Sequence, residues 1–276
     1  MPRARIAVRE GVLRDLAAAR RALRGPALKD AGIHGVRRHI KRARAGLRLL
    51  RSLLGKAEYR RDNVALREVA ASLREARDAK VMRVEARSLA ATAPTRAAWR
   101  TFQDELRRDH TLAMQRLTRR PRTAAAGLLQ AVSQRLSQSG GGQQRERDAS
   151  RTGLRRTYER ARRAFQAARR DGSVERWHEC RKQMKYVNHQ LDLLAEAGFA
   201  GMAAWRRRAH RLTALLGEDH DLALLRQRMS ESPGAQANEG VACALDERRG
   251  RLQRKALRLG ATLLQHGSRE FSRRAL

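Results

Sequence analysis

Residues 33–50 have the sequence Ile-His-Gly-Val-Arg-Arg-His-Ile-Lys-Arg-Ala-Arg-Ala-Gly-Leu-Arg-Leu-Leu, in which apolar and basic side chains each recur regularly. Its apolar side chains recur at alternating spacings of three and four residues, at Ile33, Val36, Ile40, Ala43, Leu47, Leu50 and, just beyond, Leu54. This period matches one face of an α-helix, so the stretch predicts a helix with a single buried side.

A line of basic side chains follows the same period one residue later, at His34, Arg37, Lys41, Arg44, Arg48 and Arg51. One residue is a turn of about 100° around a helix, so this line flanks the buried face. Like charges three or four residues apart repel by a few tenths of a kcal/mol per pair, a cost that an ordinary solvated face avoids by mixing signs. Donors about 5.4 Å apart along a helix suit successive phosphates of a polymer.

The same pattern returns in the second half of the chain. Residues 177–194 align without gaps on residues 33–50, and His178, Arg181 and Lys185 then match His34, Arg37 and Lys41. The second apolar line consists of Trp177, Cys180, Met184, Val187, Leu191 and Leu194. Residues 73–82 also match residues 216–225, which pairs two acidic residues in each half, Glu75 with Glu218 and Asp78 with Asp221. The two halves therefore look like copies of one four-helix unit, which predicts an internal duplication.

Helical periodicity covers nearly the whole chain, and no segment alternates with a period of two, so the predicted fold is all-α. We expect breaks at Gly25-Pro26, Gly55, Pro94, Pro121, Asp171-Gly172, Gly198 and Pro233-Gly234. The strongest break is the Ser-, Gly- and Gln-rich stretch 137–144. We therefore predict one domain, residues 1–276, made of a helical half 1–137, a flexible linker 138–147 and a helical half 148–276.

Charge sets the class of partner. The 276 residues include 62 basic and 28 acidic ones, 55 of the basic residues are Arg, and the formal net charge is +34. A small soluble domain usually carries a charge of about 2 to 8 in magnitude, so this excess indicates a polyanionic partner. A genome biased toward Arg would also enrich Arg without any such partner.

Other sequence signals exclude several classes of protein. The longest run without Asp, Glu, Lys or Arg is Thr123–Gln134, which is too short to span a bilayer. The first ten residues hold no apolar signal-peptide segment. Cys180 and Cys243 have no paired spacing, so we expect neither a disulfide framework nor a cysteine-bound zinc. These observations favour a cytoplasmic protein without a membrane partner; they leave the oligomeric state open.

The motifs resemble those of the CHAD family, α-helical domains named for their histidines. The family pattern, His-x-x-Arg-x-x-x-Lys/Arg-x-x-Arg followed by Arg-Asp, is met in the first half by His34, Arg37, Lys41, Arg44 and Arg77-Asp78. The second half meets it at His178, Arg181, Lys185 and Asp221, and departs from it at Asn188-His189, where Arg-Tyr is frequent, and at His220, where Arg is expected. The resemblance implies two pseudo-symmetric four-helix bundles, one compact unit, and a basic central groove or pore.

The resemblance also implies non-enzymatic binding of inorganic polyphosphate, often at polyphosphate granules. The candidate phosphate-binding residues lie on the two basic helices: His34, Arg37, Arg38, Lys41, Arg42, Arg44, Arg48, His178, Arg181, Lys182, Lys185 and His189. The acidic residues that we expect to support them are Glu75, Asp78, Glu218 and Asp221. A nearby polyanion would favour the charged form of the two repeated histidines. We expect no cofactor and no metal, because too few carboxylates converge.

Two alternatives stay open. The charge fits a helical nucleic-acid-binding protein equally well, although single-strand recognition usually stacks bases on aromatic side chains, and the chain has only 4 Phe, 3 Tyr and 3 Trp. Weak nonspecific binding of nucleic acid is therefore expected at most. The second alternative is an enzyme of polyphosphate or triphosphate metabolism. The sequence contains neither the Glu-x-Glu-x-Lys motif of the triphosphatase domains fused to some family members nor a phosphate-binding loop of ATP-dependent kinases.

Overall fold

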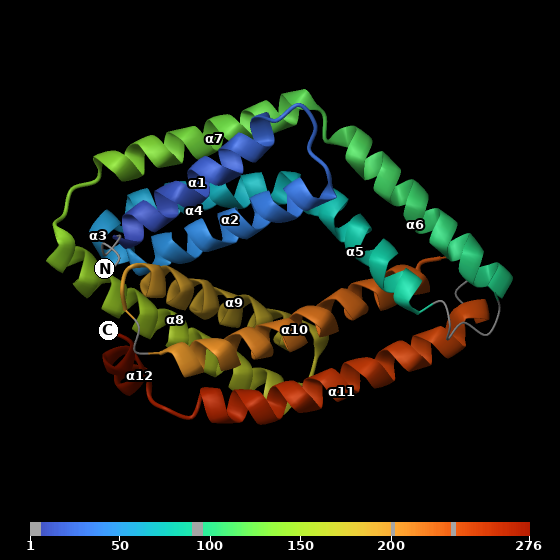
Figure 1. Ribbon diagram of the computed structural model, residues 1–276. Helices are drawn as coiled ribbons and strands as arrows, with labels where there is room; N and C mark the ends of the chain where they lie inside the picture. Colours follow the sequence, from blue (N-terminus) through green and yellow to red (C-terminus); the bar gives the residue numbers. More distant parts are fainter. Residues whose placement is uncertain (1–6, 90–95, 200–201, 233–235) are drawn as a thin grey trace.

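The computed structural model describes residues 7–89, 96–199, 202–232 and 236–276. Within these ranges all regular secondary structure is helical and no strand occurs, which confirms the all-α prediction (Figure 1). No helix in the described part of the chain is long and apolar enough to cross a membrane.

The first half of the chain forms seven helical segments within the described residues: α1 (Val8–Arg24), α2 (Asp30–Leu49), α3 (Arg51–Leu54), α4 (Lys56–Ser72), α5 (Arg74–Ser88), α6 (Arg96–Arg116) and α7 (Arg119–Gln138). The second half forms α8 (Gln143–Asp171), α9 (Val174–Glu196), α10 (Ala203–Ser230), a 3-10 turn (Gln236–Asn238), α11 (Glu239–Leu263) and α12 (Ser268–Ala275). The predicted four helices per half are thus divided more finely, above all in the first half.

Local chemistry explains where the helices end. Gly55 and Gly172 have φ of +81° and +71°, a backbone conformation that glycine adopts without strain, and each stands between two helices as predicted. Pro121 corrects a prediction, because it lies inside the first turn of α7 rather than in a break. A proline is tolerated there because its missing N–H would have no helical partner. The chain leaves the helical state just before this helix, at residues 117–118.

The remaining predicted breaks give a mixed outcome. Helix α1 ends at Arg24, directly before Gly25-Pro26, and a break also follows α9 near Gly198. The predicted breaks at Pro94 and Pro233-Gly234 lie outside the described residues. Helix α7 ends at Gln138 and α8 begins at Gln143, so only residues 139–142 of the predicted linker 138–147 are non-helical.

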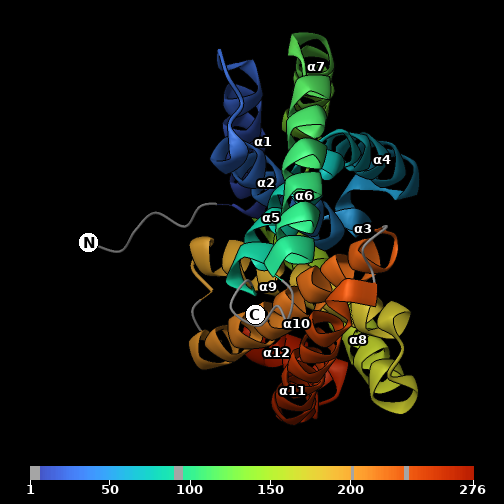
Figure 2. The same cartoon turned by 90° about the vertical axis from the view of Figure 1, so that its right-hand side faces the viewer.

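The two basic helices lie at the centre of the molecule. Helix α1 packs on α2 as α8 packs on α9, and α2 contacts α9 across the two halves. Farther along, α5 packs on α6 as α10 packs on α11, and α5 contacts α10. Figures 1 and 2 show the first half above the second, with these central pairs between them. The matching pairs agree with the predicted duplication, which itself stays a prediction.

Burial of the two apolar lines holds this centre together. Every residue of both predicted lines is buried, and Val36, Ile40, Cys180, Met184 and Val187 are fully inaccessible to solvent. Their side chains belong to one core that extends through both halves, and a smaller core joins α5, α6, α10 and α11. The predicted helical faces are confirmed, and they fix which side of α2 and of α9 turns toward the other half.

Candidate functional site

Four helices bring charged side chains together between the two halves. We call this group the central cluster; its members are Arg37 and Lys41 of α2, Arg77 and Asp78 of α5, Arg181 and Lys185 of α9, and Asp221 of α10. Arg77 ties it together, because its Nη1 donates to Asp78 Oδ1 at 3.0 Å and its Nη2 donates to Asp221 Oδ1 at 3.0 Å. The second of these bonds joins the two halves of the chain.

The cluster contains five basic side chains and two carboxylates, and both carboxylates are paired with Arg77. Neither Lys41 nor Lys185 forms an ion pair within 4 Å of a carboxylate in the described part of the chain. Burial, followed by the charge of Arg181, lowers the pKa of Lys41 to about 7. Burial and the same arginine lower the pKa of Lys185 to about 6. The cluster therefore holds more basic groups than its two carboxylates can neutralise.

The arginines of the cluster are fixed in place but incompletely bonded. Arg37 Nη1 donates to the carbonyl of Ala70, at the end of α4, while its Nε is buried without a partner among the described residues. Arg181 is only 9% exposed, its Nε also lacks a partner, and burial lowers its pKa to about 10. Buried donors without acceptors are costly, so an anion that accepted their hydrogen bonds would stabilise the site.

Three histidines lie beside the central cluster. His178 Nδ1 is 3.3 Å from His220 Nδ1, and their ring centroids are 4.7 Å apart. Burial, with nearby cations, lowers the pKa of His34 and of His178, and it lowers the pKa of His220 to about 3. The free protein therefore keeps these three rings neutral near pH 7, so they add no positive charge to the cluster. Each neutral ring offers one N–H donor.

The basic line of α2 continues into a second group next to the cluster. The guanidinium of Arg48 lies 4.0 Å from the ring centroid of Tyr186 on α9, and that of Arg44 lies 5.9 Å from it. Arg44 Nε also donates to Asn63 Oδ1 of α4 at 3.1 Å. Tyr186 and Asn63 were missed by sequence reasoning; the one signal for Tyr186 is its place directly after Lys185.

Three other predicted residues lie apart from this arrangement. Arg42 donates to Asp15 Oδ2 of α1 at 2.9 Å and to Glu196 Oε1 of α9 at 2.7 Å, so carboxylates already occupy its guanidinium. Lys182 pairs with Glu179 on its own helix. Arg38 is exposed near His34, whose pKa its charge lowers.

His189 belongs to α9, and the charges of Lys185 and Lys41 act on it. Its Nδ1 is buried without a partner in the described structure, and burial, with the charge of Lys185, lowers its pKa to about 3. It therefore stays neutral, and the structure places it next to the cluster rather than among its cations.

The four acidic residues take matching positions in the two halves. Asp78 and Asp221 hold Arg77, as described above. Glu75 of α5 pairs with Arg116 of α6, and Glu218 of α10 pairs with Arg248 of α11 at 2.6 Å. In each half, therefore, the aspartate faces the cluster and the glutamate pairs with an arginine of the following helix. No group of three or more His, Cys, Asp or Glu side chains in the described residues could hold a metal ion.

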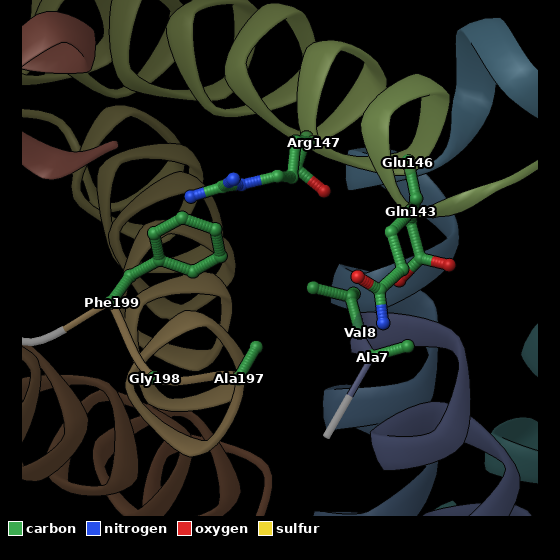
Figure 3. A pocket seen from close by; sticks show the side chains of 9 residues that line it. Ala7, Val8, Gln143, Glu146, Arg147, Ala197, Gly198 and Phe199 are labelled. Carbon is green, nitrogen blue, oxygen red and sulfur yellow. The ribbon is translucent and has the colours of Figure 1, made fainter. Parts of the chain in front are cut away.

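A separate hollow of about 100 Å³ lies where α1, α8 and α9 meet, and it contains none of the predicted site residues (Figure 3). The guanidinium of Arg147 lies over the ring of Phe199, 5.1 Å from its centroid. Beside it, the buried carboxylate of Glu146 accepts the backbone N–H of Arg9 at 3.0 Å. These contacts join the ends of three helices, so we interpret this region as structural.

Comparisons with known proteins agree with this architecture. The crystal structure of the CHAD domain from the plant Ricinus communis is similar, with a TM-score of 0.55 and 18% identity; the match covers 95% of this chain and 93% of that one. No curated protein matches the sequence. The family profile described as CHAD domain matches residues 7–230. This match covers most of the chain, including the whole central cluster, so the chain belongs to the CHAD domain family.

Proposed function

We propose that this protein binds inorganic polyphosphate at the central cluster without catalysing a reaction on it. One observation carries the proposal: five basic side chains, which are cations when protonated, converge from the two halves on a buried region in which both carboxylates are already paired with Arg77. Such charges stay favourable only when an anion neutralises them. Phosphate oxygens are suitable acceptors for arginine and lysine donors.

A linear phosphate polymer fits better than a single phosphate. From His34 to Arg48 the basic line of α2 extends about 21 Å at 1.5 Å per residue, and donors recur along it at each turn. The central cluster occupies one part of this line, and the group around Tyr186 continues it. We therefore expect affinity to rise with chain length as the ligand comes to cover both groups.

Several features support binding rather than turnover. The two carboxylates of the cluster are bonded to Arg77, and the three histidines beside it are neutral donors surrounded by cations. No group there is placed as a general base with a second group to orient it. Family membership adds support, and with it we propose an association with polyphosphate granules.

Charge reversal at matched net charge tests the proposal. The central variant changes Arg37, Lys41, Arg181 and Lys185 to Glu. The control variant changes four exposed arginines of α6 and α7 to Glu, namely Arg100, Arg108, Arg119 and Arg120. Both variants lower the net charge by the same amount, so loss of the long-range field alone would weaken both equally.

We expect the central variant to bind polyphosphate at least about a hundredfold more weakly, equivalent to about 2.7 kcal/mol, and the control less than about tenfold. Affinity is measured by anisotropy with end-labelled polyphosphate, and circular dichroism checks the helical content of both variants. Equal losses in two folded variants would overturn the proposal. Tighter binding of DNA than of polyphosphate at the same salt concentration would favour the nucleic-acid alternative, and phosphate release with magnesium would favour the enzyme.

A further inference from the structure

A row of arginines outside the central cluster follows the outer face of α8. Three hollows, of about 420, 220 and 460 Å³, lie along this face, first against α12 and finally against α9. The first and second share Arg155, and the second and third share Arg160 and Arg163, so the hollows form one continuous path. We call this path the α8 track; its arginines are Arg151, Arg155, Arg156, Arg160 and Arg163 of α8, Arg176 of α9, and Arg269 and Arg273 of α12.

The track has a large excess of positive charge. Two carboxylates line it, those of Glu159 and Glu179, and each is already paired, with Arg163 at 3.1 Å and with Lys182 respectively. All eight track arginines are exposed, so their guanidinium groups can reach a ligand without first breaking a buried contact. Along α8 alone, Arg151 and Arg163 are about 18 Å apart at 1.5 Å per residue.

The track ends beside the central cluster. Its last hollow is lined by Arg176, Glu179 and Gln183 of α9, whereas His178 and Arg181 of the same helix face the cluster. The two surfaces are thus separated by one helix, about 10 Å thick. Exposed Lys182 is placed between them, because it pairs with Glu179 and its charge lowers the pKa of His178.

We propose that the α8 track is a second phosphate-binding surface, which holds the part of a long polyphosphate chain that extends beyond the central cluster. This inference rests on the proposed function and adds to it a path for the polymer. It assigns affinity for short chains to the cluster and additional affinity for long chains to the track.

The lining of the track favours a bare phosphate chain over nucleic acid. Among the residues that the structure describes, no aromatic side chain lines any of the three hollows, so bases would find no stacking platform there. Besides charged groups, small polar side chains such as Thr152, Ser268 and Ser272 line the first two hollows. Grooves between neighbouring helices also accept a thread of phosphates more readily than a duplex, whose phosphates lie on a broad, rigid surface.

The experiment uses two ligands and three variants of the full chain. The track variant changes Arg155, Arg160, Arg269 and Arg273 to Glu, because none of these four takes part in an ion pair in the described structure. The central and control variants described above carry the same change of net charge. Affinities for tripolyphosphate and for long-chain polyphosphate are measured by isothermal titration calorimetry at several salt concentrations.

We expect the track variant to bind tripolyphosphate within about twofold of the control variant and long-chain polyphosphate at least about tenfold more weakly than the control variant. For the long chain, the slope of the logarithm of the association constant against the logarithm of the salt concentration should become smaller in magnitude by about 3, because about four phosphate contacts are lost. A track variant that binds long chains as the control variant does would overturn the inference. So would an equal loss for both ligands.

Failure of this inference can be told apart from failure of the proposed function. If the wild-type protein binds neither ligand, the proposed function fails. If the central variant loses both ligands while the track and control variants bind long chains equally, the proposed function stands and the track has no role. Far-UV circular dichroism and the melting temperature of each variant establish that it is folded before its affinity is interpreted.

Discussion

Binding of polyphosphate should take up protons at Lys41 and Lys185, and a pair of conservative substitutions should abolish this coupling. Burial and the neighbouring cations lower the pKa of these lysines to about 7 and about 6 in the free protein. Arg181, Arg77 and Asp221 act on both, and of these groups only Asp221 favours the charged form. A phosphate chain in contact with the lysines would favour their charged form strongly, so each lysine that is neutral before binding gains a proton.

The magnitude follows from the free-state values. At pH 8 a lysine with a pKa of about 7 is roughly one-tenth charged and one with a pKa of about 6 is roughly one-hundredth charged, so uptake approaches about two protons. Near pH 6 both are largely or half charged, and the uptake falls below about one. Affinity should therefore weaken at least about tenfold from pH 6 to pH 8.

The ligand's own titration has the opposite sign. The terminal phosphate groups of the chain lose a proton near a pKa of about 6, so the ligand gains negative charge as the pH rises. That change alone would strengthen binding to a cationic protein. Weaker binding at higher pH can therefore be assigned to groups of the protein.

Calorimetry in buffers of different ionisation enthalpy measures the proton uptake directly, with long-chain polyphosphate as the ligand. Replacing both lysines with arginine keeps the positive charge but removes the titration, because the guanidinium stays protonated at these pH values. The Lys41→Arg, Lys185→Arg variant should bind well at pH 8 and show a flat profile. A profile as steep as that of the wild-type protein, or no proton uptake at pH 8, would refute the reasoning.

Three further predictions concern stability. Gly153→Ala should lower the free energy of unfolding by about 1 to 3 kcal/mol, because the new Cβ would lie 2.5 Å from the backbone of Leu49. In the control variant Gly127→Ala the new Cβ meets nothing within 4 Å, so the free energy of unfolding should rise slightly. Equal effects of the two substitutions in urea unfolding would contradict this prediction. Arg77→Ala should lower the free energy of unfolding by about 1 to 3 kcal/mol, and a double-mutant cycle with Asp221→Asn should give a coupling energy of at least about 0.5 kcal/mol. Additive losses in the cycle would show that the bond between Arg77 and Asp221 does not stabilise the contact between the halves. Without ligand, the melting temperature of the protein should rise from pH 6 to pH 9, because Lys41 and Lys185 bind more protons in the unfolded state than in the folded state. A melting temperature that falls over this pH range would argue against the lowered pKa values.

The fold could be predicted from the sequence to the extent that it depends on the period of apolar residues. The lines that begin at Ile33 and Trp177 are buried as predicted because a helix has no other way to satisfy that pattern. The division of the described part of the first half into seven helical segments could not be predicted, because single residues such as Leu50 and Leu73 interrupt the helix without a Gly or Pro signal. Pro121 shows the converse, a strong breaker placed where a helix tolerates it.

The positions of the candidate site residues along each helix could be predicted from the sequence, but the face of the helix that stays free for a ligand could not. The repeated spacing of His, Arg and Lys places Arg37, Lys41, Arg181 and Lys185 on matching turns, and the structure brings these four together. The same spacing gives no reason to exclude Arg42, which is one residue from Lys41 and yet faces Asp15 and Glu196. Which flank of a basic helix stays free depends on the carboxylates of the neighbouring helices, and those come from distant parts of the chain.

The protonation of the site depends even more on tertiary structure. A sequence assigns an ordinary pKa to every lysine and histidine, so it points to His34 and His178 as the groups that titrate near neutral pH. Packing four helices together lowers the pKa of those histidines and also brings two lysines into the range from about 6 to about 7. Desolvation and converging cations are properties of the assembled centre, which no single helix contains. The lysines, rather than the histidines that name the family, should therefore set the pH dependence of binding.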